Sequence, residues 1–204
     1  EVEVGAELAM ALGEAGFVPL AWYDAGARSF YNRRRPVRRL ADLAGLKIRV
    51  QRSEVMSDTV EALGASSVAL GFKQVYTSLH TGAIDGAENN LPSYRSERHV
   101  EAAGFYSYDR HSMIPDLLLI RREIWEGLSG EERSALRRAA QASSLAQRRL
   151  WDQYEEEALA AVRAAGSRVN EIAEREPFRR AVEPVYRAYR QQYGDLVERV
   201  RGRE

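Results

Sequence analysis

The chain has no cysteine among its 204 residues, so it contains no disulfide, no thiolate metal ligand and no cysteine nucleophile. An excess of either charge is also absent, because 30 basic and 30 acidic side chains balance. A net charge of zero provides no general attraction to nucleic acid or to an anionic membrane. No apolar run reaches the roughly 18 residues that a membrane-spanning helix needs, and no signal peptide is recognisable.

The common motifs of enzymes and nucleotide-binding proteins are missing as well. The sequence contains no G-x-G-x-x-G, P-loop, H-E-x-x-H or G-x-S-x-G segment. His80, His99 and His111 lack the spacing of metal ligands, and isolated histidines are more often surface or core residues. No nucleophile–base pair stands out. The sequence therefore predicts no enzyme, no metal site and no cofactor.

Hydrophobic patterns of strand and helix type alternate through residue 91, which is typical of an α/β fold with a largely parallel sheet. The expected helices cover residues 4–15, 37–45, 54–63, 72–81, 92–99, 129–165 and 177–200, the last broken near Pro184. The expected strands cover residues 17–23, 28–32, 46–51, 66–70, 83–84, 104–110, 113–122 and 167–172.

The long helix expected after residue 129 lies outside this alternation and should brace the α/β units. Ser129 and Glu132 form an S-x-x-E capping box at its start. Its periodicity predicts a buried stripe that includes Leu136, Ala140, Leu150, Tyr154 and Val162.

A few polar and aromatic residues at strands or strand ends have two interpretations each. Arg49, in the middle of KIRV, is either a solvent-facing residue, which composition alone favours, or a planar fork for a carboxylate. The same alternatives hold for Arg28. Asn89 is a turn or cap residue, or a ligand contact, and Phe72 is a core residue or a pocket wall.

The stretch AIDGAENNL, residues 83–91, is unusually polar for its apolar surroundings. It is either an ordinary turn or a strand end that presents Glu88 and Asn89 to a ligand. Asp85 and Gly86 are expected to form the turn, because glycine tolerates backbone angles that other residues resist.

The chain resembles the substrate-binding proteins of tripartite ATP-independent periplasmic (TRAP) transporters, the DctP type. The resemblance rests on RSFYNRRRPVRRLADLAGLKIRV, EALGASSVALGFKQVYTSLHTGAIDGAENNL and MIPDLLLIRREIW, in this order and followed by a long helix. It is collinear across residues 1–165 and weaker beyond. It implies a periplasmic-binding-protein-like α/β fold of type II character, with two lobes, parallel or mixed sheets and a long lobe-spanning helix.

Function and organisation follow from the same resemblance. It implies a periplasmic receptor that binds an organic acid through its carboxylate and delivers it to the TRAP membrane subunits, without catalysis. A monomer is expected, with a dimer as the alternative. Residues 1–28 would be the remainder of the N-terminal lobe, residues 29–120 the C-terminal α/β lobe with a hinge strand, and residues 121–204 the brace helix and a helical end.

The resemblance also assigns site residues. In such receptors the arginine of the KIRV strand binds the ligand carboxylate in a bidentate salt bridge, and it matches Arg49. Arg28 matches an assisting arginine, although WYDAGAR departs from the W-D-N-G-x-R turn of the family. Asn89 matches an asparagine that orients the carboxylate. The other residues matched to the binding cleft are Phe72, Glu88 and, more loosely, His111.

The chain is shorter than such receptors and matches a portion without roughly the first hundred residues. The alternative is therefore a ligand-blind, receptor-like module that acts in protein–protein interaction through the long helix. An enzyme on a similar lobe is a third hypothesis, which the missing nucleophile–base pair disfavours.

Overall fold

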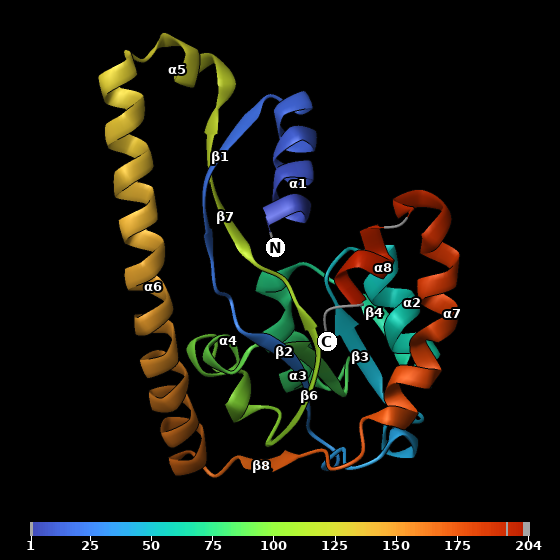
Figure 1. Ribbon diagram of the computed structural model, residues 1–204. Coiled ribbons are helices and arrows are strands. Elements are labelled where there is room, and N and C mark those ends of the chain that lie inside the picture. The colour runs from blue at the N-terminus through green and yellow to red at the C-terminus, as the bar shows by residue number, and fades with distance from the viewer. Residues whose placement is uncertain (1, 195, 202–204) are drawn as a thin grey trace. The chain divides into compact units, whose positions relative to one another are not determined.

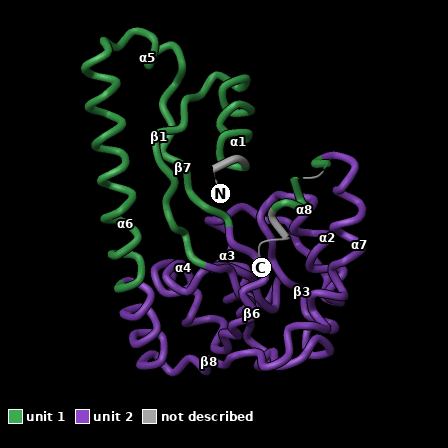
Figure 2. The backbone as a smooth tube through the Cα atoms, in the orientation of Figure 1, with its two compact units in different colours: residues 1–26, 114–153, 193–204 green, residues 27–113, 154–192 purple. Residues whose placement is uncertain are grey.

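Segments far apart in sequence come together in two units. The computed structural model describes residues 2–194 and 196–201. Unit 1 comprises residues 1–26, 114–153 and 193–204, and unit 2 comprises residues 27–113 and 154–192 (Figure 2). Each unit is assembled from separate stretches of the chain, and residues 121–204 contribute to both units.

Unit 1 contains a two-stranded antiparallel sheet of β1 (Phe17–Tyr23) and β7 (Asp116–Arg121) (Figure 1). Its helices are α1 (Val2–Glu14), α5 (Arg122–Gly127), α8 (Leu196–Arg201) and the first part of α6 (Gly130–Ala164). The strand pairing shifts between Pro19 and Ala21, as expected where a proline cannot donate a ladder hydrogen bond.

Helix α6 begins at the predicted capping box. The backbone N–H of Ser129 donates to Glu132 Oε2 at 2.8 Å, and the N–H of Glu132 donates to Ser129 Oγ at 3.3 Å. These two bonds satisfy N–H groups that a helix start leaves without partners. The box therefore fixes where the 35-residue helix starts.

The stripe expected to be buried along α6 is only partly covered. Ala140 and Val162 are buried, as predicted. The prediction was wrong for Leu136, Leu150 and Tyr154, whose exposed fractions are 37%, 62% and 37%. Periodicity identifies an apolar face, but it does not tell how much of that face another element covers.

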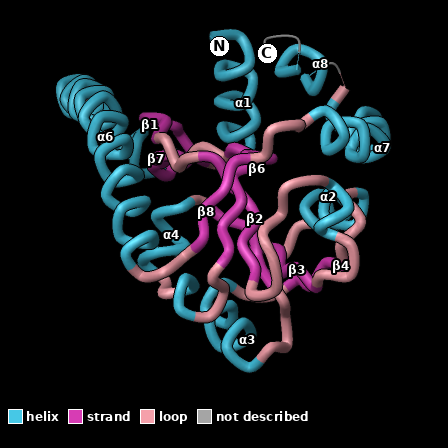
Figure 3. The backbone as a smooth tube through the Cα atoms, turned by 90° about the horizontal axis from the view of Figure 1, so that it is seen from below, coloured by secondary structure: helices cyan, strands magenta, loops and turns pink. Residues whose placement is uncertain are grey.

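Unit 2 is built on a six-stranded sheet in the order β4-β3-β5-β2-β6-β8 (Figure 3). The strands are β2 (Ala27–Asn32), β3 (Lys47–Val50), β4 (Ser66–Ala69), β5 (Gly86–Asn89), β6 (Phe105–Met113) and β8 (Arg168–Glu171). Strand β3 is parallel to β4 and β5, and β6 is parallel to β8. Because β2 runs antiparallel to both β5 and β6, the sheet is mixed rather than largely parallel.

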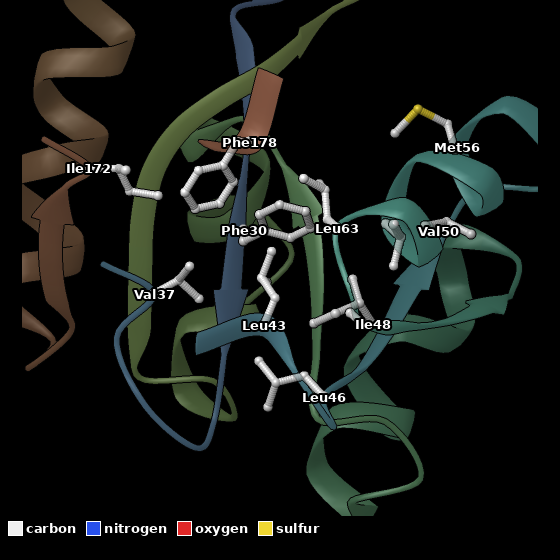
Figure 4. Close-up of a cluster of buried hydrophobic side chains, with 12 residues drawn as sticks. Phe30, Val37, Leu43, Leu46, Ile48, Val50, Met56, Leu63, Ile172 and Phe178 are labelled. Carbon is white, nitrogen blue, oxygen red and sulfur yellow. The ribbon is translucent and has the colours of Figure 1, made fainter. Parts of the chain in front are cut away.

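Helices cover both faces of this sheet (Figure 3). They are α2 (Glu54–Ala62), α3 (Val75–Thr81), α4 (Leu91–Ser96), α7 (Glu176–Tyr193) and the 3-10 helices η1 (Leu40–Leu43), η2 (Phe72–Gln74) and η3 (His99–Glu101). Phe30 and Tyr31, successive residues of β2, enter different buried clusters, as the alternation of a strand requires. Residues of α2 and α7 complete the cluster around Phe30 (Figure 4). Residues of α3, α4 and the end of α6 complete the cluster around Tyr31.

Helix α7 continues through Pro184, so the predicted break at this residue was wrong. A proline inside a helix removes one hydrogen bond and can either kink or break the helix, and here α7 continues to Tyr193. Phe178, buried in the cluster around Phe30, holds the first turns of α7 against the sheet.

Candidate functional site

The carboxyl ends of β3, β4 and β5 meet at one edge of the unit 2 sheet, because these three strands are parallel neighbours. The antiparallel strand β2 begins at the same edge, where Ser29 lies opposite Asn89. In parallel sheets, ligands bind outside the carboxyl ends of the strands. A pocket of about 400 Å³ lies here, lined by Arg28, Arg49, Gln51, Arg52, Leu70, Gly71, Phe72 and Asn89.

Four of the six residues assigned from the sequence therefore surround one pocket: Arg28, Arg49, Phe72 and Asn89. Sequence reasoning missed the other four lining residues. Gln51 and Arg52 directly follow β3, and Leu70 and Gly71 directly follow β4. The rule that ligands meet the carboxyl ends of parallel strands would have indicated them.

Arg49 is buried, with 4% of its surface exposed, so the solvent-facing interpretation is wrong. Its Nε and Nη2 both donate to the carbonyl oxygen of Leu70, at 2.9 and 2.7 Å. Its Cζ lies 5.9 Å from the centre of the Phe72 ring. Within the described residues, Nη1 and the second N–H of Nη2 have no acceptor. The guanidinium is thus held along one edge, and the edge formed by its two terminal nitrogens is free for a planar anion.

The electrostatics of Arg49 favour an anion. Burial lowers the pKa of its guanidinium, Tyr31 and Glu88 oppose this effect, and Arg28 adds to it. A guanidinium nevertheless stays protonated in proteins. A buried cation beside a second cation is costly unless it is paired, so a bound carboxylate would remove an unfavourable arrangement.

Arg28 is largely engaged by the protein itself. Its Nη2 donates to Glu88 Oε1 and to the Glu88 carbonyl oxygen, both at 2.9 Å, and its Nε donates to Glu88 Oε2 at 2.5 Å. Its Nη1 donates to Asn89 Oδ1 at 2.9 Å. Only one N–H of Nη1 remains without an acceptor among the described residues. Arg28 can therefore offer a ligand a single hydrogen bond, whereas Arg49 can offer a bidentate pair.

Glu88 is completely buried behind Arg28 and does not line the pocket. Burial alone would raise the pKa of this carboxyl, but His111 and Arg28 beside it lower the pKa below its ordinary value. Glu88 is therefore ionised, and its carboxylate holds the Arg28 guanidinium at the pocket.

The chain bends at residues 83–85 and then forms a strand over residues 86–89, so the expected strand at 83–84 was wrong, and the turn predicted at Asp85 and Gly86 does not include Gly86. Gly86 is needed for close packing instead of an unusual backbone angle. A Cβ at this position would lie 2.3 Å from the carbonyl oxygen of Tyr31 on β2. The strand carries Asn89 to the pocket, where its Oδ1 accepts hydrogen bonds from Arg28 and from the N–H of Asn90, at 2.9 Å each. Its amide Nδ2 has no acceptor among the described residues and can donate to a ligand.

Phe72 begins η2 and is 42% exposed at the pocket. Beneath it lies His99, whose ring centre is 6.2 Å from that of Phe72 in an edge-to-face arrangement. A hydrogen bond of 2.8 Å joins His99 Nδ1 to the buried hydroxyl of Tyr31. Burial, assisted by Arg49, lowers the pKa of His99 to about 4, so this imidazole is neutral. The His99–Tyr31 pair supports the aromatic wall and was not predicted from the sequence.

His111 lies behind the pocket, on β6, and does not line it. Its Nδ1 is 2.7 Å from Asp109 Oδ2, and its ring stacks on Phe30 with the ring centres 4.5 Å apart. Nothing in the sequence distinguished Asp109, whose importance depends on the fold of β6.

Comparison with known proteins identifies the family. Residues 1–192 match the family described as "Bacterial extracellular solute-binding protein, family 7", DctP. The chain belongs to this family. A solute-binding protein of Chromohalobacter salexigens is 36% identical over 194 residues, which are 95% of this chain and 58% of the relative.

Solved structures of solute-binding proteins are also similar. A TRAP periplasmic solute-binding protein from Roseobacter denitrificans, with bound β-D-glucuronate, is 47% identical with a TM-score of 0.92, over 95% of this chain and 65% of that one. One from a Sulfitobacter species, with bound β-D-galacturonate, is 39% identical with a TM-score of 0.92, over 95% and 66%. The chain thus spans about two thirds or less of the length of these relatives.

These similarities confirm the resemblance to TRAP solute-binding proteins and the periplasmic-binding-protein-like α/β fold with its long helix. DctP-family members bind solutes and are not enzymes. In the described part of this DctP-family chain, no helix is long and apolar enough to cross a membrane. The described residues likewise contain no group of three or more histidine or acidic side chains placed to hold a metal ion.

Proposed function

We propose that this chain provides the carboxylate-binding part of a periplasmic TRAP solute receptor, whose ligand is a sugar acid such as D-glucuronate or D-galacturonate. The observation that carries the proposal is the buried guanidinium of Arg49, which is held by Leu70 along one edge and free along the other. A carboxylate that leaves water needs charge-assisted, bidentate hydrogen bonds, and a planar guanidinium edge supplies them.

The other pocket residues suit the rest of a sugar acid. The Asn89 amide and the remaining N–H of Arg28 can donate to the carboxylate or to an adjacent hydroxyl group. The exposed ring of Phe72 offers an apolar surface to the hydrophobic face of a sugar ring. The glucuronate and galacturonate bound in the two similar structures have this combination of one carboxylate and a hydroxylated ring.

Delivery of the captured acid to the TRAP membrane subunits, and a monomeric state, belong to the same proposal. Membership of the DctP family supports the first of these. The site is confined to unit 2, so we expect the 204-residue chain to retain part of the binding energy by itself.

Isothermal titration calorimetry tests the proposal. We expect the chain to bind D-glucuronate or D-galacturonate and not D-glucose, which has the ring of D-glucuronate without its carboxylate. Arg49→Gln should abolish binding, whereas Arg187→Gln, at an exposed arginine of α7, should leave it unchanged. Equal binding by the Arg49 variant would refute the assignment. A chain that binds neither acid and sediments as a stable dimer would favour the interaction-module alternative.

A further inference from the structure

Strand β6 departs from regular pairing directly beside the site. Phe30 of β2 lies opposite Ser107, but Arg28 lies opposite Ser112, so β6 has several extra residues in between. Within this bulge Arg110 has a φ of 51°, which is uncommon for a residue other than glycine. Bulges of this kind turn a side chain in a new direction and are frequent next to functional sites.

The bulge places Asp109 and His111 against the strands of the site. Asp109 Oδ1 accepts the backbone N–H of Phe30 at 3.1 Å and so replaces the acceptor that regular pairing would supply. Asp109 Oδ2 is 2.7 Å from His111 Nδ1. The Asp109 carboxylate thus accepts a backbone hydrogen bond from β2 with one oxygen and holds the His111 imidazole with the other.

His111 lies between two buried carboxylates. Its Nδ1 faces Asp109, and its Nε2 lies 3.5 Å from Glu88 Oε2. The side chains of His111, Asp109 and Glu88 are 8%, 3% and 0% exposed, so water contributes little. A neutral imidazole would turn an unprotonated nitrogen toward one of these anions, whereas an imidazolium presents an N–H to each.

We propose that His111 is a permanently protonated positioning residue, which gives the site one net positive charge and thereby selects ligands with a single negative charge. The proposal rests on the proposed function. The charged side chains of the site that are largely shielded from water are the cations Arg28, Arg49 and His111 and the anions Glu88 and Asp109, whereas Arg52, which also lines the pocket, is exposed to solvent. These five groups lie on β2, β3, β5 and β6, and one bound carboxylate would balance their net positive charge.

The electrostatics of the cluster agree with this assignment. Burial disfavours the imidazolium, but Asp109 and Glu88 outweigh it and raise the pKa of His111 to about 10. His111 therefore gains no proton when a ligand binds at neutral pH, and binding enthalpies should not depend on the ionisation enthalpy of the buffer between pH 6 and 8. A sugar diacid such as galactarate would leave an unpaired negative charge, so we expect it to bind at least tenfold more weakly than D-galacturonate.

Nitrogen-15 NMR of the ligand-free chain tests the charge state directly. We expect both ring nitrogens of His111 to be protonated at pH 7.5, with the signals assigned by their loss in His111→Gln and their retention in His80→Gln. One unprotonated ring nitrogen at this pH would overturn the proposal, whatever the chain binds. Failure of the proposed function would show separately, as absence of D-glucuronate binding by a chain whose His111 is doubly protonated.

A charge-restoring pair of substitutions separates the charge of His111 from a merely structural role. His111→Gln removes one positive charge and should weaken D-glucuronate binding by roughly tenfold or more. Adding Asp109→Asn removes one negative charge and keeps an oxygen for the Phe30 N–H, so the double variant should recover affinity to within about threefold of the parent. A double variant as weak as His111→Gln, or galactarate binding as tight as that of D-galacturonate, would overturn the charge count.

Discussion

Replacing Gly86 by alanine probes how closely β5 is packed between its two neighbours. The added Cβ would lie 2.3 Å from the Tyr31 carbonyl oxygen and 2.7 Å from Asn32 Cβ on β2, and 3.0 Å from Ile48 Cδ1 on β3. A backbone oxygen cannot rotate away, so β5 must move from the strands on both sides. An added methyl group in a packed core costs about 1–3 kcal/mol, and each lost ladder hydrogen bond costs about 1 kcal/mol. We expect Gly86→Ala to lower the free energy of unfolding by about 3 kcal/mol or more.

Gly104→Ala is the matched control, because a Cβ there meets no atom within 4 Å and the backbone angle is not in the left-handed region. Its free energy of unfolding should change by less than about 1 kcal/mol. Urea denaturation followed by circular dichroism measures both variants. Similar losses in the two, or a Gly86→Ala loss below about 1 kcal/mol, would refute this reading of the packing. Since β5 also carries Asn89, affinity for D-glucuronate should fall in Gly86→Ala and not in the control.

Three further outcomes are expected. Arg49→Lys should weaken D-glucuronate binding in calorimetry by at least about tenfold, because one ammonium group cannot reproduce both guanidinium edges; unchanged affinity would contradict this. The pKa of His99 is about 4 in the folded chain and about 6.5 in the unfolded chain. The neutral imidazole therefore contributes fully to the free energy of unfolding above about pH 6.5, and this contribution is lost as the pH falls through the folded pKa. The urea midpoint of His99→Gln should therefore fall less between pH 7 and pH 4 than that of the parent, and equal falls would oppose the assignment. Val162→Ala, in the core, should cost about 2 kcal/mol and Leu150→Ala, on the exposed side of α6, less than about 0.5 kcal/mol; the reverse order in urea denaturation would show that α6 packs differently.

Much of the local structure follows from short-range patterns. The pattern of residues 46–51 predicted a strand, and β3 forms there with Ile48 and Val50 buried. The capping box predicted the start of α6. These features depend on residues close together in sequence, so the local pattern contains the necessary information.

Other features required the tertiary structure. Composition alone favoured a solvent-facing Arg49, but the Leu70 carbonyl and the Phe72 ring of η2 lie against its guanidinium. Leu136, Leu150 and Tyr154 on α6 were expected to be buried and are exposed. Nothing in the sequence indicates which turns of a helix another element covers.

By itself, the sequence determined the family, the α/β class and part of the pocket lining, namely Arg28, Arg49, Phe72 and Asn89. It did so because strand ends, caps and motif spacings are local properties. Only the tertiary structure decided what each of those residues does: Glu88 holds Arg28, Leu70 orients Arg49, and the β6 bulge brings His111 between two carboxylates. Charge and hydrogen-bonding partners separated by 21 or more residues in the chain meet only when the strands pair, and burial then sets how strongly they interact.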